Sequence, residues 1–229
     1  MYFGMFDPFQ IIIMIASVVI TGWAQMKIRN AYSKYSQITS WRSITGADVA
    51  RSLLRGSGLD DVRVERISGE LTDHYDPRER VLRLSTGVYS NRSIAAIGIA
   101  AHEVGHAIQH DHGYAPLGIR NSLVPVANIG SQLAWPMVLI GIFFPAFDFL
   151  VNIGIILFAG AVVFQLITLP VELNASNRAL ALLNTGGYLQ GEELEGAKKV
   201  LNAAALTYIA AAATAILFLI RLLLLRRDD

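Results

Sequence analysis

The sequence contains no cysteine and few charged residues. Without cysteine there can be no disulfide and no thiolate ligand, so any zinc site must use histidine and carboxylate. Charged residues make up 16% of the 229 positions and hydrophobic residues 53%, a composition far from that of ordinary soluble proteins. A net charge of +1 argues neither for nor against a polyanionic partner, and no role with nucleic acid is expected. The composition therefore predicts a protein embedded in the lipid bilayer.

The hydrophobic residues are concentrated in four runs that are long enough to cross a bilayer. The first run lies at about 6–26, and because no Lys or Arg precedes it, we interpret it as an uncleaved anchor rather than a signal peptide. Two runs at about 124–144 and 149–169 are joined by a tight link ending at Asp148, which predicts a hairpin. The last run lies at about 201–225.

A charged segment with short hydrophobic stretches lies between the first two runs. The stretch 45–55 is typical of a capped amphipathic helix, and 62–67 alternates in hydrophobicity as a strand does. The stretches 71–75 and 80–85 predict a hairpin. We expect 80–85 to be an edge strand that could pair with an extended substrate, although an ordinary covered strand is about equally compatible.

The motif H-E-x-x-H occurs at 102–106, within an Ala- and Ile-rich stretch that favours a helix. Residues four apart lie on the same helix face, so the imidazoles of His102 and His106 can reach one ion. Glu103 lies about 100° round the helix axis, close enough to reach a water at that ion. Neutral imidazole suits Zn²⁺, and such a carboxylate can be the general base of a hydrolase. A buried core helix with two hydrogen-bonded histidines is the alternative, but burying these three groups without a metal is costly.

A catalytic zinc usually has three protein ligands, so a third ligand is needed. His112 has the metzincin spacing H-E-x-x-H-x-x-G-x-x-H, but Gln109 replaces the glycine at which that motif turns the chain. Glu172 is the only acid between Asp148 and Glu192, and it lies directly after the third hydrophobic run. An acid next to a membrane-spanning run is energetically costly and usually has a function. We favour Glu172 as the third ligand and keep His112 as the alternative.

The predicted organisation follows from these elements. We expect a mainly α membrane protein with about four transmembrane helices and a small α+β zincin-like catalytic unit that carries the H-E-x-x-H helix. The predicted segments are a transmembrane anchor (1–26), a cytoplasmic α+β catalytic segment (27–120), a transmembrane hairpin (121–170), a cytoplasmic helix with the third zinc ligand (171–200), and a last transmembrane helix and tail (201–229). Thirteen of the 19 Lys and Arg residues lie between Lys27 and Arg120, so the positive-inside rule predicts that the site faces the cytoplasm from the cell membrane.

Three sequence stretches resemble a known family. They are His-Glu-Val-Gly-His-Ala-Ile-Gln-His at 102–110, Pro-Val-Glu-Leu-Asn-Ala-Ser-Asn-Arg-Ala at 170–179, and Leu-Thr-Asp-His-Tyr-Asp-Pro-Arg at 71–78. Together they resemble the YugP-type membrane zinc metallopeptidases, which are gluzincins and more remotely similar to HtpX-type proteases. The resemblance implies that His102, His106 and Glu172 bind one zinc ion and that Glu103 is catalytic. HtpX-type enzymes have an acid where this chain has Ser176, so Asn177 and Asp111 become the candidates for orienting a ligand histidine.

The predicted function is membrane-embedded zinc endopeptidase, acting on proteins or peptides that include membrane proteins. His74 and Arg178 are weaker candidates for stabilising the oxyanion, and a surface or lipid-phosphate contact is an alternative role for them. A catalytically silent metal-binding scaffold that recruits partners is the alternative function, although it would not need Glu103. A site-2-type intramembrane protease is disfavoured because no later run contains the second acidic motif. The sequence does not predict an oligomeric state.

Overall fold

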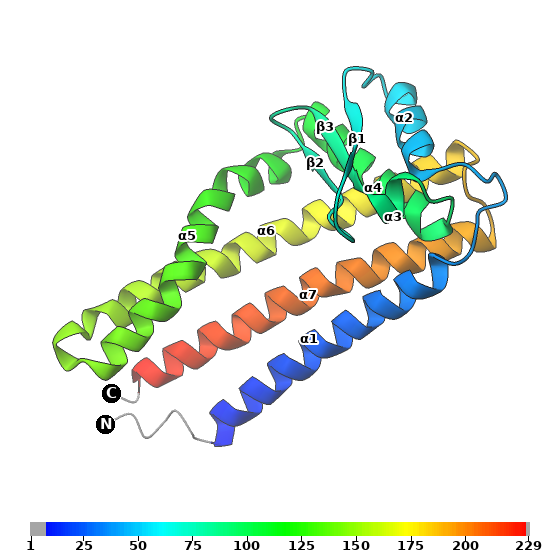
Figure 1. Ribbon diagram of the computed structural model, residues 1–229. Coiled ribbons are helices and arrows are strands. Elements are labelled where there is room, and N and C mark those ends of the chain that lie inside the picture. The colour runs from blue at the N-terminus through cyan, green and yellow to red at the C-terminus, as the bar shows by residue number, and fades with distance from the viewer. Residues whose placement is uncertain (1–7, 228–229) are drawn as a thin grey trace. The chain divides into compact units, whose positions relative to one another are not determined.

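The structure is a computed structural model that describes residues 8–227 and contains two compact units. The first unit comprises the described residues of 1–25, 118–169 and 207–229, and the second comprises 26–117 and 170–206. Along the chain (Figure 1) the elements are α1 (Pro8–Tyr35), α2 (Gly46–Gly56), β1 (Arg63–Ile67), β2 (His74–Asp76), β3 (Val81–Ser85), α3 (Thr86–Tyr89), α4 (Ile94–Asp111), α5 (Ala115–Phe143), the short 3₁₀ helix η2 (Pro145–Phe147), α6 (Phe149–Thr185) and α7 (Glu192–Arg227). The predicted segment boundaries differ from these units and remain predictions.

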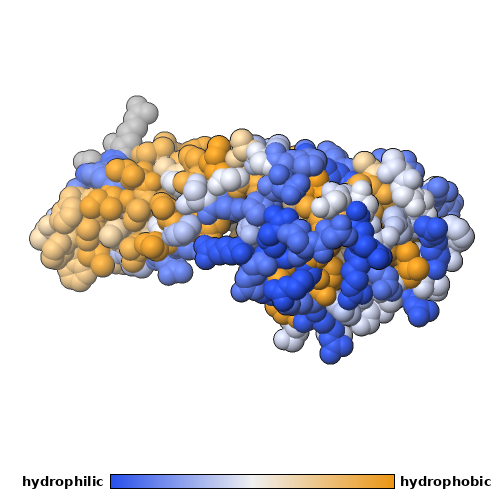
Figure 2. Space-filling model, turned by 90° about the horizontal axis from the view of Figure 1, so that it is seen from above, coloured by the Kyte–Doolittle hydropathy of each residue, from blue (hydrophilic) through white to orange (hydrophobic). Residues whose placement is uncertain are grey.

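Four helices of the described chain, α1, α5, α6 and α7, are long and apolar enough to cross a membrane. Large apolar side chains point outward from them: Val18 is 73% exposed and Ile156 is 70% exposed. Figure 2 shows broad hydrophobic areas on the surface. Such surface is costly in water and favourable in a bilayer. The fold thus confirms a mainly α membrane protein with four candidate membrane helices and a small α+β part.

In the first unit, α5 and α6 form the predicted hairpin and pack through glycine. A Cβ on Gly154 would lie 2.6 Å from Val138 Cγ2 and 2.9 Å from the carbonyl oxygen of Ala134, so only glycine fits there. Gly160 has nothing within 4 Å of such a Cβ and does not contribute to this packing. The α5–α6 link is held by Asp148, whose two carboxylate oxygens accept hydrogen bonds from Arg226 at 2.7 and 2.8 Å.

In the second unit, the three-stranded sheet has the order β1-β3-β2, with β3 parallel to β1 and antiparallel to β2 (Figure 1). The prediction that 80–85 is an edge strand is therefore wrong. β3 is the central strand and four of its five residues are buried, whereas the edge strands β1 and β2 contain no buried residue. Pairing of a substrate with this sheet would have to use β1 or β2.

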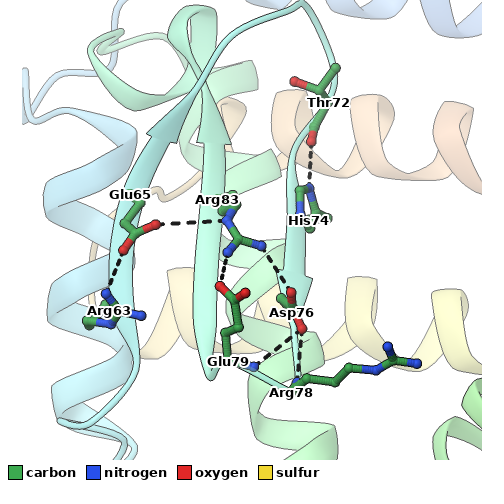
Figure 3. Close-up of polar contacts among 8 residues, drawn as sticks. All are labelled: Arg63, Glu65, Thr72, His74, Asp76, Arg78, Glu79 and Arg83. Carbon is green, nitrogen blue, oxygen red and sulfur yellow. Dashed lines mark hydrogen bonds and ion pairs between the residues drawn. The ribbon is translucent and has the colours of Figure 1, made fainter.

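Arg83 on β3 links all three strands through its guanidinium group (Figure 3). Its Nη1 donates to Asp76 Oδ2 on β2 at 3.0 Å, and its Nε lies 3.8 Å from Glu65 Oε2 on β1. Its Nη2 donates to Glu79 in the β2–β3 turn. The side chain of Arg83 is only 22% exposed, so these contacts are partly shielded from water.

The helix α4 lies in the core of the second unit. It begins at Ser93, whose hydroxyl accepts a hydrogen bond from the backbone N–H of Ala96 and so caps the helix. Most of its residues are buried, and they pack against α2, α3 and the sheet. This burial fixes the face of α4 that carries the H-E-x-x-H motif.

Candidate metal centre

The candidate site forms where α4 meets the part of α6 that belongs to the same unit. A Cβ on Gly105 would lie 2.6 Å from the carbonyl oxygen of Ala175, so the two backbones are in direct contact at this point. Gly105 immediately precedes His106, and Ala175 lies one helical turn after Glu172. The close approach therefore explains why a carboxylate distant in sequence reaches the two histidines.

Three side chains converge in this contact. Glu172 Oε2 lies 3.2 Å from Nε2 of His102 and 3.5 Å from Nε2 of His106. The two imidazole rings are nearly perpendicular, with their centroids 4.7 Å apart. Glu172 is 3% exposed as a side chain, and the histidines are 15% and 10% exposed. Among the described residues, these three form the group whose ligand atoms all lie within 4.8 Å of one another.

The donor set fits a zinc ion. With ligand bonds near 2.0–2.1 Å, two ligands of a tetrahedral zinc lie about 3.3 Å apart, and the two distances from Glu172 Oε2 to the imidazoles are 3.2 and 3.5 Å. Two imidazoles and one carboxylate also match the three-ligand set of catalytic zinc sites. The ligand assignment was predicted from sequence and remains a prediction, which this geometry supports.

The second nitrogen of each imidazole contacts a polar side chain. Nδ1 of His102 lies 3.1 Å from Ser176 Oγ, and Nδ1 of His106 lies 2.9 Å from Gln109 Oε1. The candidates proposed from the sequence, Asn177 and Asp111, do not make these contacts; Asp111 instead lies 3.8 Å from Arg80. Ser176, the residue at the position of the expected acid, therefore contacts His102 itself, with a hydroxyl in place of a carboxylate.

The electrostatics of the site favour a positive charge. Burial by itself would lower the pKa of His106, but the hydrogen bond with Glu172 and the negative charge of Glu103 outweigh it and raise the pKa above its ordinary value. Glu103 is 7% exposed, and no hydrogen bond to its carboxylate is found within residues 8–227. A buried carboxylate without a donor, beside a candidate metal site, is suited to hold a water molecule.

The remaining predicted site residues are not among the three converging side chains. His74 is on β2, exposed, with Nδ1 2.9 Å from the carbonyl oxygen of Thr72 (Figure 3). His112 is the C-terminal cap of α4 and does not belong to the metal-binding group. Arg178 donates from Nε to Asn174 Oδ1 at 2.8 Å, and its Nη1 lies 3.5 Å from His112 Nδ1. The catalytic roles suggested for His74 and Arg178 remain predictions.

Sequence reasoning did not identify Gln109 and Asn174 as parts of the site. Gln109 has an available signal, because it lies three residues after His106 and so projects from nearly the same helix face. Asn174 gave no such signal. It joins the site only because α6 packs against α4, and this contact cannot be deduced from spacing along the chain.

These features are those of a membrane zinc peptidase: two histidines on one helix, a carboxylate that joins them from another helix, and four candidate membrane helices. Residues 10–227 match the family described as "putative neutral zinc metallopeptidase", and the chain belongs to this family. It is 46% identical over 215 residues to the "putative membrane protease YugP" of Bacillus subtilis (strain 168), covering 94% of this chain and 95% of that protein. These matches confirm the resemblance found in the sequence. No solved structure matches the chain.

Proposed function

We propose that the chain is a zinc-dependent endopeptidase of the cell membrane that holds one Zn²⁺ with His102, His106 and Glu172. The observation that carries the proposal is the position of Glu172 Oε2, within 3.5 Å of Nε2 of both histidines. Zinc, when bound there, would supply Lewis-acid chemistry that acidifies a water and polarises the carbonyl of a peptide bond. Its substrates would be proteins or peptides, membrane proteins included.

Glu103 performs the proton transfers in this proposal. Its carboxylate accepts a proton from the attacking water, and the same oxygen then delivers the proton to the nitrogen of the leaving amine. The low exposure of Glu103 and its lack of a hydrogen-bond donor within residues 8–227 support this role, because the carboxylate is available to water. A positioned general base of this kind accelerates a reaction by roughly 10²- to 10⁴-fold.

The test uses the purified full-length chain in detergent, with casein as the substrate and zinc content measured on the same samples. We expect about one zinc per chain and cleavage that a chelator abolishes and zinc restores. Glu103→Gln should keep the zinc and lose cleavage by roughly 10²-fold or more, whereas Glu70→Gln, at an exposed loop position, should change neither. Zinc binding without cleavage by the wild-type protein would instead indicate the silent scaffold.

We also propose that the site faces the cytoplasm. The charge distribution supports this orientation, since most Lys and Arg residues lie in the segment that carries the site. The absence of native cysteine allows a clean labelling test with single introduced cysteines. In intact cells, a membrane-impermeant thiol reagent should label Ala146→Cys in the α5–α6 link and should reach Ser68→Cys only after permeabilisation. The reverse pattern would show the opposite orientation.

A further inference from the structure

A continuous set of hydrogen bonds leads from His106 to side chains that do not belong to the metal-binding group. Nδ1 of His106 lies 2.9 Å from Oε1 of Gln109, which is completely buried. The amide nitrogen of Gln109 donates to the carbonyl oxygen of Val171 at 2.8 Å and to Oδ1 of Asn174 at 3.0 Å. Asn174 Oδ1 also accepts the hydrogen bond from Nε of Arg178 at 2.8 Å.

The two ends of this network determine the direction of every hydrogen bond in it. The carbonyl of Val171 can only accept, so the atom of Gln109 that faces it must be the amide nitrogen. The guanidinium of Arg178 can only donate, so the atom of Asn174 that faces it must be the oxygen. Gln109 therefore presents its oxygen to His106, which must carry its proton on Nδ1. The lone pair of His106 is then left on Nε2, the atom that faces Glu172.

We propose that Gln109 is a positioning residue for the metal site and that Asn174 and Arg178 hold its amide in the required orientation. This inference rests on the proposed zinc site. The network fixes both the tautomer and the ring orientation of His106 before any metal binds. Arg178 thereby acts through Asn174 and Gln109 rather than on the substrate, which differs from the oxyanion role suggested by the sequence.

The other ligand histidine has no comparable restraint. Its partner, Ser176 Oγ, is a hydroxyl that can donate or accept, so it permits either tautomer of His102. Only the neutral form with a free Nε2 can bind zinc at this position. The fixed tautomer of His106 thus makes the site asymmetric, and loss of Gln109 should affect zinc binding more than loss of Ser176.

The experiment measures the zinc dissociation constant of the full-length protein in detergent by competition with a chromophoric chelator. Gln109→Met keeps a similar side-chain length but cannot accept the proton of Nδ1 or donate to Val171. Asn174→Leu removes the acceptor for Gln109 and Arg178, whereas Asn174→Asp keeps an oxygen that accepts from both. Gln190→Met, at an exposed position outside the site, is the matched control. Circular dichroism establishes that each variant has the helix content of the wild type.

We expect Gln109→Met and Asn174→Leu to weaken zinc binding by roughly 10- to 100-fold, as is usual when a partner of a ligand histidine is removed. Asn174→Asp should bind zinc within roughly threefold of the wild type, because the hydrogen-bond directions are unchanged. The visible absorption of the Co²⁺-loaded Gln109→Met protein should also differ from that of the wild type. A merely structural role of Gln109 would leave the spectrum of the folded, loaded protein unchanged.

Two negative results have different meanings. If the wild type binds zinc and Gln109→Met binds it equally tightly, the positioning role is refuted and the zinc site stands. The same holds if Asn174→Asp weakens binding as much as Asn174→Leu. If the wild type binds no zinc, both this inference and the proposed function are refuted.

Discussion

Replacing Gly105 with alanine tests whether the contact between α4 and α6 sets the geometry of the metal site. The added Cβ would lie 2.6 Å from the carbonyl oxygen of Ala175 and 3.2 Å from its Cα. Ordinary contacts begin at 3.4 Å, so the two helices would have to separate by about 0.8 Å, the difference between 3.4 and 2.6 Å. Both neighbours are backbone atoms, which cannot move aside as a flexible side chain could.

This displacement is large compared with the tolerance of a zinc site. Ligand distances in such sites vary by only about 0.2 Å, and Glu172 Oε2 now lies 3.5 Å from His106 Nε2. Overpacking a tight contact typically costs about 1–3 kcal/mol. If that cost appears mainly in metal binding, the zinc dissociation constant of Gly105→Ala rises roughly 5- to 150-fold, at 1.4 kcal/mol for each factor of ten.

The assay is chelator competition on wild type, Gly105→Ala and Gly98→Ala, together with a thermal melt of each metal-free protein. Gly98 is the matched control because it lies on the same helix, and its Cβ would meet the Cβ of Ala197 at 3.3 Å, a contact that a small shift relieves. We expect Gly98→Ala to bind zinc nearly as the wild type does. If Gly105→Ala binds zinc with wild-type affinity, the helix contact does not control the site.

Three further predictions concern pH and the sheet. Because the pKa of His106 is raised in the metal-free protein, protons compete with zinc, and the zinc dissociation constant should rise as pH falls from 8 to 6. In the metal-free protein, the stability contributed by protonated His106 is lost as pH rises through the folded-state pKa of His106. Burial raises the pKa of Asp73 despite the hydrogen bonds that its carboxylate accepts from Ser85. The contribution of Asp73 to stability is therefore largest below its unfolded-state pKa and is lost as pH rises through its folded-state pKa. In thermal melts at pH 3–7, Asp73→Asn should not show this loss of stability with rising pH. Arg83→Met should make backbone amide exchange in β1 and β2 faster, and unchanged exchange would contradict the linking role of Arg83.

Much of the fold follows from local pattern. Hydrophobic runs of membrane-spanning length identify α1, α5, α6 and α7, and the cap at Thr45 identifies the start of α2. The order of the strands could not be derived in this way. The hairpin of β2 and β3 does not determine where β1 pairs, and β1 pairs in parallel with the free side of β3, a long-range contact that local pattern does not predict. The error at 80–85 arose there.

The candidate site, too, could be predicted where local pattern suffices and not where it depends on tertiary contacts. The spacing in H-E-x-x-H fixes His102 and His106 on one face of α4 without any tertiary information. Glu172 stood out because an isolated acid beside a hydrophobic run is unusual. The partners of the histidines were not recognised because an amide and a hydroxyl are common residues with no distinctive pattern. Their role depends on a backbone contact between two helices, and Gly105 gives no sign of that contact in the sequence.

The arrangement of donors argues for a cation more strongly than the motif does. Glu172 Oε2 and the two Nε2 atoms all point to one small volume, and three lone pairs held together in a buried site repel one another. A proton or a metal ion among them relieves this repulsion. The raised pKa of His106 means that, in the metal-free protein, the site favours a proton on His106. The proposed zinc ion would take the place of that proton at higher pH, and Gln109, by accepting the Nδ1 proton of His106, leaves the lone pair on Nε2 for the ion.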